Sequence, residues 1–342
     1  MSTVSFSSPA QHVVEGHSSA AARAFALVTL VVMVAACLLA GWAPLGFSIV
    51  TVFLFAGPHN WFEARYLMSR MPPRWGPLRI YFLTGISGVL TLTAAFAALP
   101  WITDRLGWDH DGWLTGLAIW NTALVAWIVA LVLMRSRQNP TRDWGWIAPV
   151  GLAVIGVNWL APQAWDLGLI YLHPVMAMWF LDREIAVHKP DWQRAYRGCL
   201  CAVPVLLAAL WWHLSATESL PGEDALTARI TLHAGAGILT NVSSHLLVST
   251  HTFLEMLHYG VWLIAIPLVS LRGKLWRLDQ VPLARGSYSW RMVCGAILAA
   301  GFFAVLGFWA GFIADYATTR DVYFTVAMLH VLAEVPFLLR LL

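Results

Sequence analysis

The chain has 342 residues, of which 59% are hydrophobic and only 11% are charged. Soluble domains carry about 25% charged residues, so the composition excludes an ordinary soluble protein and indicates a polytopic helical membrane protein. The formal net charge of +3 is small, and the basic residues lie between apolar segments, a pattern that predicts no binding to nucleic acid.

Apolar segments of about 20 residues, the length that crosses a hydrocarbon core of about 30 Å, recur along the chain. A polar stretch rich in serine and alanine, residues 1–22, precedes them and is predicted to be a disordered cytoplasmic tail. Residues 23–342 are predicted to form a single transmembrane domain of about ten helices, an all-α fold. These helices are expected at residues 23–42, 45–68, 79–99, 113–134, 145–161, 165–183, 197–213, 249–271, 290–314 and 322–341.

The charges of the loops predict the topology. Basic residues gather in four loops, whereas loops 100–112 and 214–225 are acidic, with Arg105 the single basic residue between them. The basic loops cover residues 69–79, 135–142, 183–197 and 272–291. Because basic loops stay inside, we expect both termini in the cytoplasm of a protein of the bacterial inner membrane. Counting 226–248 as a span would move the last basic loop outside, so we interpret it as a re-entrant or interfacial segment.

Several ionisable side chains fall inside the predicted spans, where each costs at least ~2.5 kcal/mol on insertion scales. Three histidine–glutamate pairs have a spacing of four residues, which places both members on one face of a helix. The pairs are His59 with Glu63, His251 with Glu255, and His330 with Glu334. His258 follows Glu255 on the same face, and His173 is a single imidazole in a middle span. Such side chains must face the bundle interior and find partners, and we hypothesise that the partner is a metal.

Depth supports this hypothesis. At 1.5 Å per residue, His173, His258 and His330 lie about 12–14 Å below the outer surface, near the middle of the membrane, with His59 and Glu334 somewhat deeper. Four spans therefore bring imidazoles to a comparable level. The structural alternatives are hydrogen-bonded core histidines and, for Glu63, a charge at the inner membrane edge. Asn121 and Asn158 are candidate partners in interhelical hydrogen bonds.

Imidazole binds iron, zinc and copper, and carboxylates favour iron, so non-haem iron is the expected cofactor, with zinc and copper left open. His251 is a candidate ligand or proton shuttle, and with Glu255 it forms the candidate catalytic pair. The candidate metal ligands are His59, Glu63, His173, His251, Glu255, His258, His330 and Glu334.

The order of these motifs resembles that of the Brp/Blh-type membrane β-carotene dioxygenases of bacteria and archaea. The matching stretches are Gly57-Pro58-His59-Asn60, Tyr171-Leu172-His173-Pro174, His251 through His258, and His330 through Glu334. The resemblance implies a non-haem iron centre held by histidines in a helical bundle, which an apolar polyene reaches through the lipid. This chain differs from the family pattern after His59 and in the spacing of His251 and His258.

The sequence therefore favours a membrane oxygenase that acts on a lipid-soluble substrate, a carotenoid, an isoprenoid or another apolar molecule. Its electron donor is not predicted. The alternative is a proton- or ion-coupled transporter that uses the intramembrane histidine–glutamate pairs as a relay. A third interpretation is a b-type haem protein with two axial histidines. The chain contains no phosphate-binding loop, nucleophile elbow or zinc-protease motif.

Overall fold

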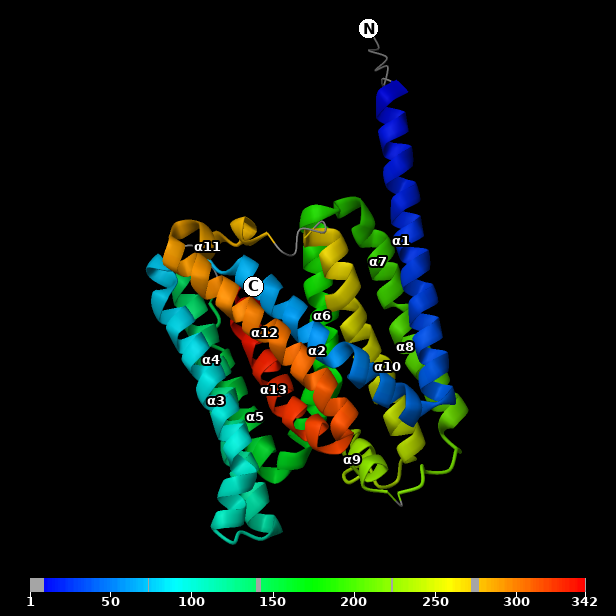
Figure 1. Ribbon diagram of the computed structural model, residues 1–342, viewed down its shortest axis with the longest axis vertical. Helices are drawn as coiled ribbons and strands as arrows, with labels where there is room; N and C mark the ends of the chain where they lie inside the picture. Colours follow the sequence, from blue (N-terminus) through cyan, green and yellow to red (C-terminus); the bar gives the residue numbers. More distant parts are fainter. Residues whose placement is uncertain (1–8, 73, 140–142, 223, 272–276, 342) are drawn as a thin grey trace. The chain divides into compact units, whose positions relative to one another are not determined.

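The computed structural model describes residues 9–72, 74–139, 143–222, 224–271 and 277–341, and every regular element in these ranges is helical (Figure 1). Within them, nine helices are long and apolar enough to cross a membrane. The predicted all-α, polytopic helical bundle is thereby confirmed, and the chain is an integral membrane protein.

Three of the nine membrane-spanning candidates consist of consecutive helical pieces. In chain order, the nine are α1 (Pro9–Trp42), α2 (Pro44–Arg70), η1 with α3 (Gly76–Leu78 and Arg79–Arg105), α4 (His110–Gln138), α6 (Pro162–His188), α7 with α8 (Pro190–Leu200 and Ala202–Leu214), α10 with the π-helical η2 and η3 (Ser244–Gly260, Val261–Ala265 and Pro267–Leu271), α12 (Tyr288–Ala314) and α13 (Tyr316–Leu341). The shorter elements are η1 (Gly76–Leu78), α5 (Ile147–Leu160), α9 (Ala225–His233), η4 (Leu278–Gln280) and α11 (Pro282–Gly286).

Three stretches differ from a simple series of full spans. Helix α5, expected to cross the membrane, has 14 residues and is about 21 Å long, short of a core of about 30 Å. The 226–248 stretch covers most of the nine-residue helix α9, the turns that follow it and the first residues of α10, which begins at Ser244; α9 is too short to cross. Helix α1 begins at Pro9, inside the stretch predicted to be a disordered tail, and residues 1–8 of that stretch lie outside the described residues.

The chain divides into two compact units, where we expected one domain over 23–342. The first unit contains residues 1–51 and 174–273, and the second contains residues 52–173 and 274–342. Helices α2 and α6 contribute residues to both units, because the chain passes from one unit to the other inside each of these helices.

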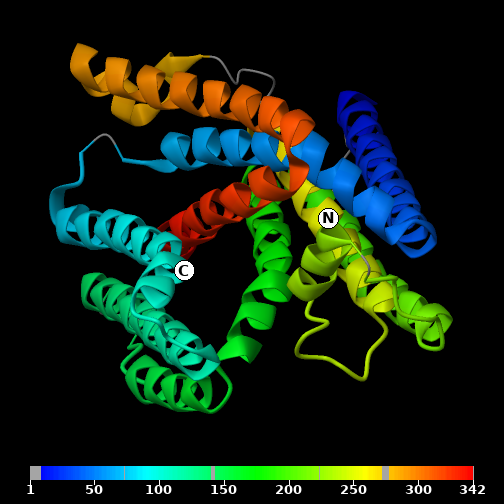
Figure 2. The same cartoon turned by 60° about the horizontal axis from the view of Figure 1, so that its bottom comes forward.

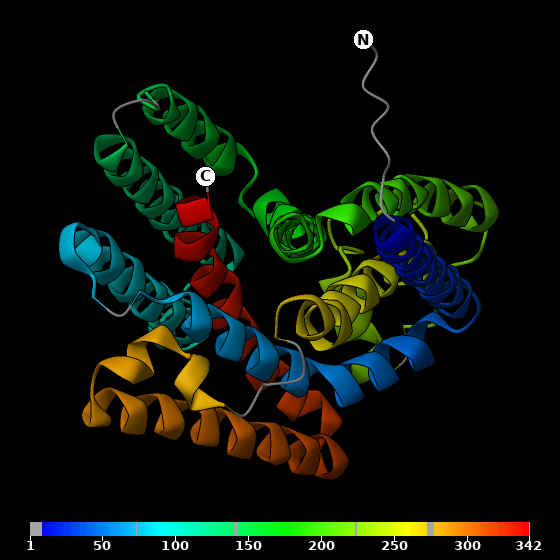
Figure 3. The same ribbon diagram turned by 90° about the horizontal axis from the view of Figure 1, so that it is seen from above.

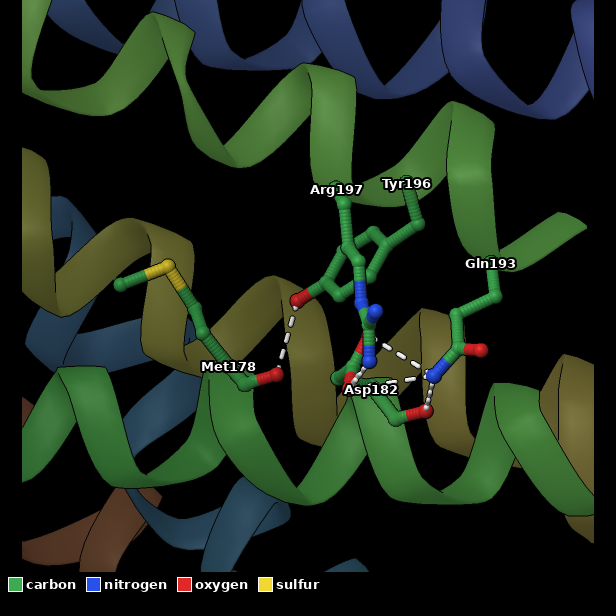
Figure 4. A network of polar contacts seen from close by, with 5 residues as sticks. All are labelled: Met178, Asp182, Gln193, Tyr196 and Arg197. Carbon is green, nitrogen blue, oxygen red and sulfur yellow. Dashed lines mark hydrogen bonds and ion pairs between the residues drawn. The ribbon is translucent and has the colours of Figure 1, made fainter.

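In the first unit, α1 packs beside α7, α8 and α10 (Figure 3). A polar network joins the end of α6 to α7 (Figure 4). The Asp182 carboxylate accepts hydrogen bonds from Nε and Nη2 of Arg197, each at 2.9 Å, and from Nε2 of Gln193 at 3.2 Å. The Tyr196 hydroxyl donates to the Met178 carbonyl at 3.0 Å. These contacts hold α7 against α6 across the turn at Lys189.

The second unit has its core between α3, α4 and α13, and α5 packs against α4 (Figure 2). Buried indoles fix the spacing of α3 and α4: Trp120 Nε1 donates to the Leu92 carbonyl at 2.8 Å, and Trp127 Nε1 donates to the Thr84 carbonyl at 3.0 Å. The Asn121 amide donates to Asn158 Oδ1 at 2.8 Å and joins α4 to α5, the interhelical bond expected for these two side chains.

We expect Gly88→Ala to destabilise the second unit. A Cβ at Gly88 would lie 1.9 Å from Trp127 Nε1, and that indole is buried and hydrogen-bonded to α3. The steric conflict should cost about 1–3 kcal/mol and lower the melting temperature in detergent. Gly156→Ala is the matched control, because a Cβ there meets no atom within 4 Å. It should leave the melting temperature unchanged or raise it, and equal losses in both variants would contradict this prediction.

Candidate metal centre

Helix α2 presents His59 and Glu63 on one face, one turn apart. Their side chains are 0% and 1% exposed. His59 Nδ1 lies 3.1 Å from the Phe55 carbonyl oxygen. Because a carbonyl only accepts hydrogen bonds, Nδ1 carries the proton and Nε2 keeps its lone pair. Metal-binding histidines have this arrangement, in which the backbone fixes the tautomer and the other nitrogen points at the ion.

His173 of α6 and His330 of α13 approach each other through the same ring atoms. Their Nε2 atoms are 3.1 Å apart. His173 Nδ1 lies 3.3 Å from Glu334 Oε2, and Glu334 is 0% exposed. The carboxylate of Glu334 therefore lies against Nδ1 of His173, without the geometry of a hydrogen bond, and Nε2 of the same ring faces that of His330. Sequence spacing had paired Glu334 with His330, whereas the structure places its carboxylate against an imidazole from another helix.

These side chains form one cluster in the second unit, which we call the His/Glu cluster: His59, Glu63, His173, His330 and Glu334. The His330 ring centroid is 5.0 Å from that of His59 and 5.0 Å from that of His173. One ligand atom each from His59, Glu63 and His330 lie within 4.8 Å of one another. Each of the three helices contains a proline near these residues, namely Pro58, Pro174 and Pro336. Proline has no backbone N–H group, so one hydrogen bond of each helix is lost there.

The distances fit a bound cation. Two nitrogens that bind one ion at about 2.0–2.1 Å lie roughly 2.8–3.4 Å apart when their directions differ by a right or tetrahedral angle. The 3.1 Å between the Nε2 atoms of His173 and His330 falls in this range. A simple N–H···N hydrogen bond between the rings is the structural alternative, and it leaves the neighbouring carboxylates without an explanation.

Glu63 is the strongest indication of a missing positive charge. Neither of its carboxylate oxygens has a hydrogen-bond partner in the described part of the chain, although the side chain is 1% exposed. The negative charge of Glu334 acts on it unfavourably. A buried carboxylate without partners is costly unless a proton or a cation neutralises it. The donor set of imidazoles and carboxylates therefore suits a metal ion.

The predicted residues His251, Glu255 and His258 lie on α10, in the first unit. His251 Nδ1 is 3.9 Å from Glu255 Oε2, beyond hydrogen-bond distance. Glu255 Oε1 instead accepts a hydrogen bond from the Tyr259 hydroxyl at 2.7 Å. The sequence analysis missed Tyr259, although its spacing of four residues from Glu255 could have identified it.

His258 is buried, with its ring centroid 5.8 Å from that of Tyr259 and 6.5 Å from that of Trp262. The ring of His251 lies 5.1 Å from that of His233. The roles of His251, Glu255 and His258 as metal ligands stay predictions. The helix that carries them continues into π-helical turns at Val261–Ala265, a geometry often found at functional sites.

No family model, curated protein or solved structure matches this chain. The resemblance to the membrane β-carotene dioxygenases stays a prediction, and the chemistry of the His/Glu cluster is the basis for the function considered next.

Proposed function

We propose that this protein is an integral-membrane metalloenzyme, a non-haem iron oxygenase that acts on a lipid-soluble substrate such as a carotenoid or an isoprenoid. The proposal rests on one observation: three imidazoles and two carboxylates from α2, α6 and α13 lie close together, and the Nε2 atoms of His173 and His330 are 3.1 Å apart. All three helices are candidate membrane spans.

The residues of the cluster divide into two groups by their contacts. His59, His173 and His330 would offer Nε2, and Glu63 would offer a carboxylate oxygen. Glu334 would hold the ring of His173 in the productive orientation through Nδ1. When bound, iron would supply the capacity to activate O2. The chain supplies the burial that keeps water from the centre.

Two features support iron and an apolar substrate. Imidazole binds iron, zinc and copper alike, and the two carboxylates tilt the choice toward iron. The cluster belongs to apolar helices, so a substrate dissolved in the lipid has the shortest route to it. The side-by-side imidazoles of His173 and His330 disfavour a b-type haem, because the axial ligands of a haem lie on opposite faces of the ring.

One observation favours the alternative of an ion-coupled transporter. On α10, His251, Glu255 and Tyr259 form a row of buried or half-buried polar side chains at a spacing of four residues. Intramembrane rows of this kind are typical of proton relays. A transporter would move an ion across sealed vesicles in the absence of O2, which the oxygenase would not do.

The test is the metal content and visible spectrum of detergent-purified protein. We expect iron in a fixed ratio to protein, no Soret band, and incorporation of oxygen from O2 into an apolar substrate supplied in micelles. His188→Ala should retain the metal, because His188 contacts Glu184 in the first unit. Folded protein that stays free of transition metals, even after anaerobic incubation with ferrous iron, would refute the proposal.

A further inference from the structure

Three arginines gather where helices of the second unit end, and we call them the arginine cluster: Arg70, Arg135 and Arg340. Each lies in the last turn of its helix, α2, α4 and α13 respectively. The first turn of α3 lies beside them, since the guanidinium of Arg340 is 5.8 Å from the ring centroid of Phe82. The three arginines are half-buried.

Hydrogen bonds to neutral groups hold the cluster together. Arg340 Nη1 donates to the Arg70 carbonyl at 2.5 Å. Arg135 donates from Nε to the Leu339 carbonyl and from Nη2 to the Arg340 carbonyl, each at 3.4 Å, and from Nη1 to Gln138 Oε1 at 3.0 Å. These bonds cap the ends of α2 and α13 and fix the guanidiniums close to one another. They do not cancel the positive charges.

Among the described residues, neither Arg135 nor Arg340 forms an ion pair with a carboxylate, so both guanidiniums keep their positive charge. The charges of Arg135 and Arg70 act unfavourably on Arg340. A negatively charged group beside Arg135 and Arg340 would offset this repulsion.

The location of the cluster indicates which anion. The candidate spans Pro44–Arg70 and Tyr316–Arg340 end at cluster residues, so the guanidiniums lie at the level of the lipid headgroups. On α3, Ile80 and Leu83 are 69% and 49% exposed, and acyl chains can follow this apolar face from the cluster into the membrane. A guanidinium fork matches the oxygens of a phosphate group.

We propose that the arginine cluster binds the headgroup of an anionic phospholipid through its phosphate group. The phosphate oxygens accept hydrogen bonds from N–H groups of Arg135 and Arg340, and the acyl chains lie along α3. The bound lipid ties together the ends of α2, α4 and α13, two of which carry residues of the His/Glu cluster. The lipid site does not depend on the proposed oxygenase activity.

The test is a titration of delipidated, full-length protein with phosphatidic acid and, separately, with phosphatidylcholine, followed by native mass spectrometry and by the melting temperature. We expect phosphatidic acid to bind at least about tenfold more tightly and to raise the melting temperature. Arg340→Gln should weaken that binding about tenfold, the loss expected for a hydrogen bond to a charged group. Arg105→Gln is the matched control, because Arg105 also lies in a last turn over an aromatic ring, 5.7 Å from that of Trp101, yet is exposed and apart from the cluster.

Three outcomes would overturn the proposal: equal binding of the two lipids, equal losses in Arg340→Gln and Arg105→Gln, or stabilisation by inorganic phosphate without any response to lipid. If Arg340→Gln does not fold, the comparison of the two lipids on the unmodified protein decides alone. Metal content should be the same in Arg340→Gln and the unmodified protein, so failure of the lipid proposal and failure of the metal proposal are distinguishable.

Discussion

Replacing His330 with alanine is expected to abolish metal retention while the protein still inserts into the membrane and folds. His330 contacts the cluster on two sides, with its Nε2 3.1 Å from that of His173 and its ring 5.0 Å from that of His59. Removing a residue that hydrogen-bonds to a metal ligand typically lowers the affinity for the metal about 10–100-fold. Removing a ligand itself should lower that affinity at least about 100-fold. Metal per protein after purification, measured beside the elution volume in size-exclusion chromatography, tests this prediction.

Two further variants distinguish a metal ligand from a residue that only orients a ligand. Glu334→Gln should lower metal affinity about 10–100-fold without abolishing it, because Glu334 acts on His173 through Nδ1. His188→Ala should change nothing. If His330→Ala and His188→Ala retained the same amount of metal, the assignment of the centre would be wrong. His258→Ala in the same assay tests the ligand that the sequence predicts on α10.

The second large effect is expected from Glu63→Leu, which should stabilise the metal-free protein but weaken the binding of the metal. In metal-free protein the leucine should raise stability by about 1–3 kcal/mol, because it removes a buried carboxylate whose oxygens have no hydrogen-bond partner among the described residues. The same substitution should lower the affinity for the metal at least about tenfold, because a ligand is lost. The melting temperature of chelator-treated protein and a metal titration measure the two effects separately.

A buried glutamate that has a partner is the matched control. Glu184 is 3% exposed and lies 3.5 Å from His188 Nδ1, so Glu184→Leu should not raise the melting temperature and should leave metal affinity unchanged. A fall in the stability of metal-free Glu63→Leu, equal to that of Glu184→Leu, would mean that Glu63 is satisfied by the protein alone. In that case a cation is not needed to explain its burial.

Local spacing predicted which side chains of the His/Glu cluster share a helix face. His59 with Glu63 and His330 with Glu334 are each four residues apart, and the helical repeat alone brings both members of a pair to one face. The common depth of His173 and His330 followed from counting residues along their spans, and their rings are in contact. The tautomer of His59 could not be predicted, because it depends on where the Phe55 carbonyl points after the helix has accommodated Pro58.

Spacing failed where a carboxylate had a second possible partner. Glu334 has an imidazole one turn away on its own helix, yet its carboxylate lies against His173 of α6. Glu255 has the ideal spacing from His251 but lies 3.9 Å from it, and its other oxygen accepts a hydrogen bond from the Tyr259 hydroxyl one turn further along α10. The rotamer of a side chain determines which of these partners it contacts, and packing against neighbouring helices determines the rotamer.

The sequence by itself determined that this is a helical membrane protein and located nine of the stretches that are long and apolar enough to cross the membrane. In hydrocarbon every backbone group must be satisfied within its own helix, so length and apolarity identify such stretches. The sequence also determined which ionisable side chains must find partners inside. Only the tertiary structure decided which partners they found: His173 with His330 and Glu334, and three arginines at neighbouring helix ends. Those choices depend on how helices pack, which is set by many small contacts such as that between Gly88 and Trp127, and no single stretch of sequence contains them.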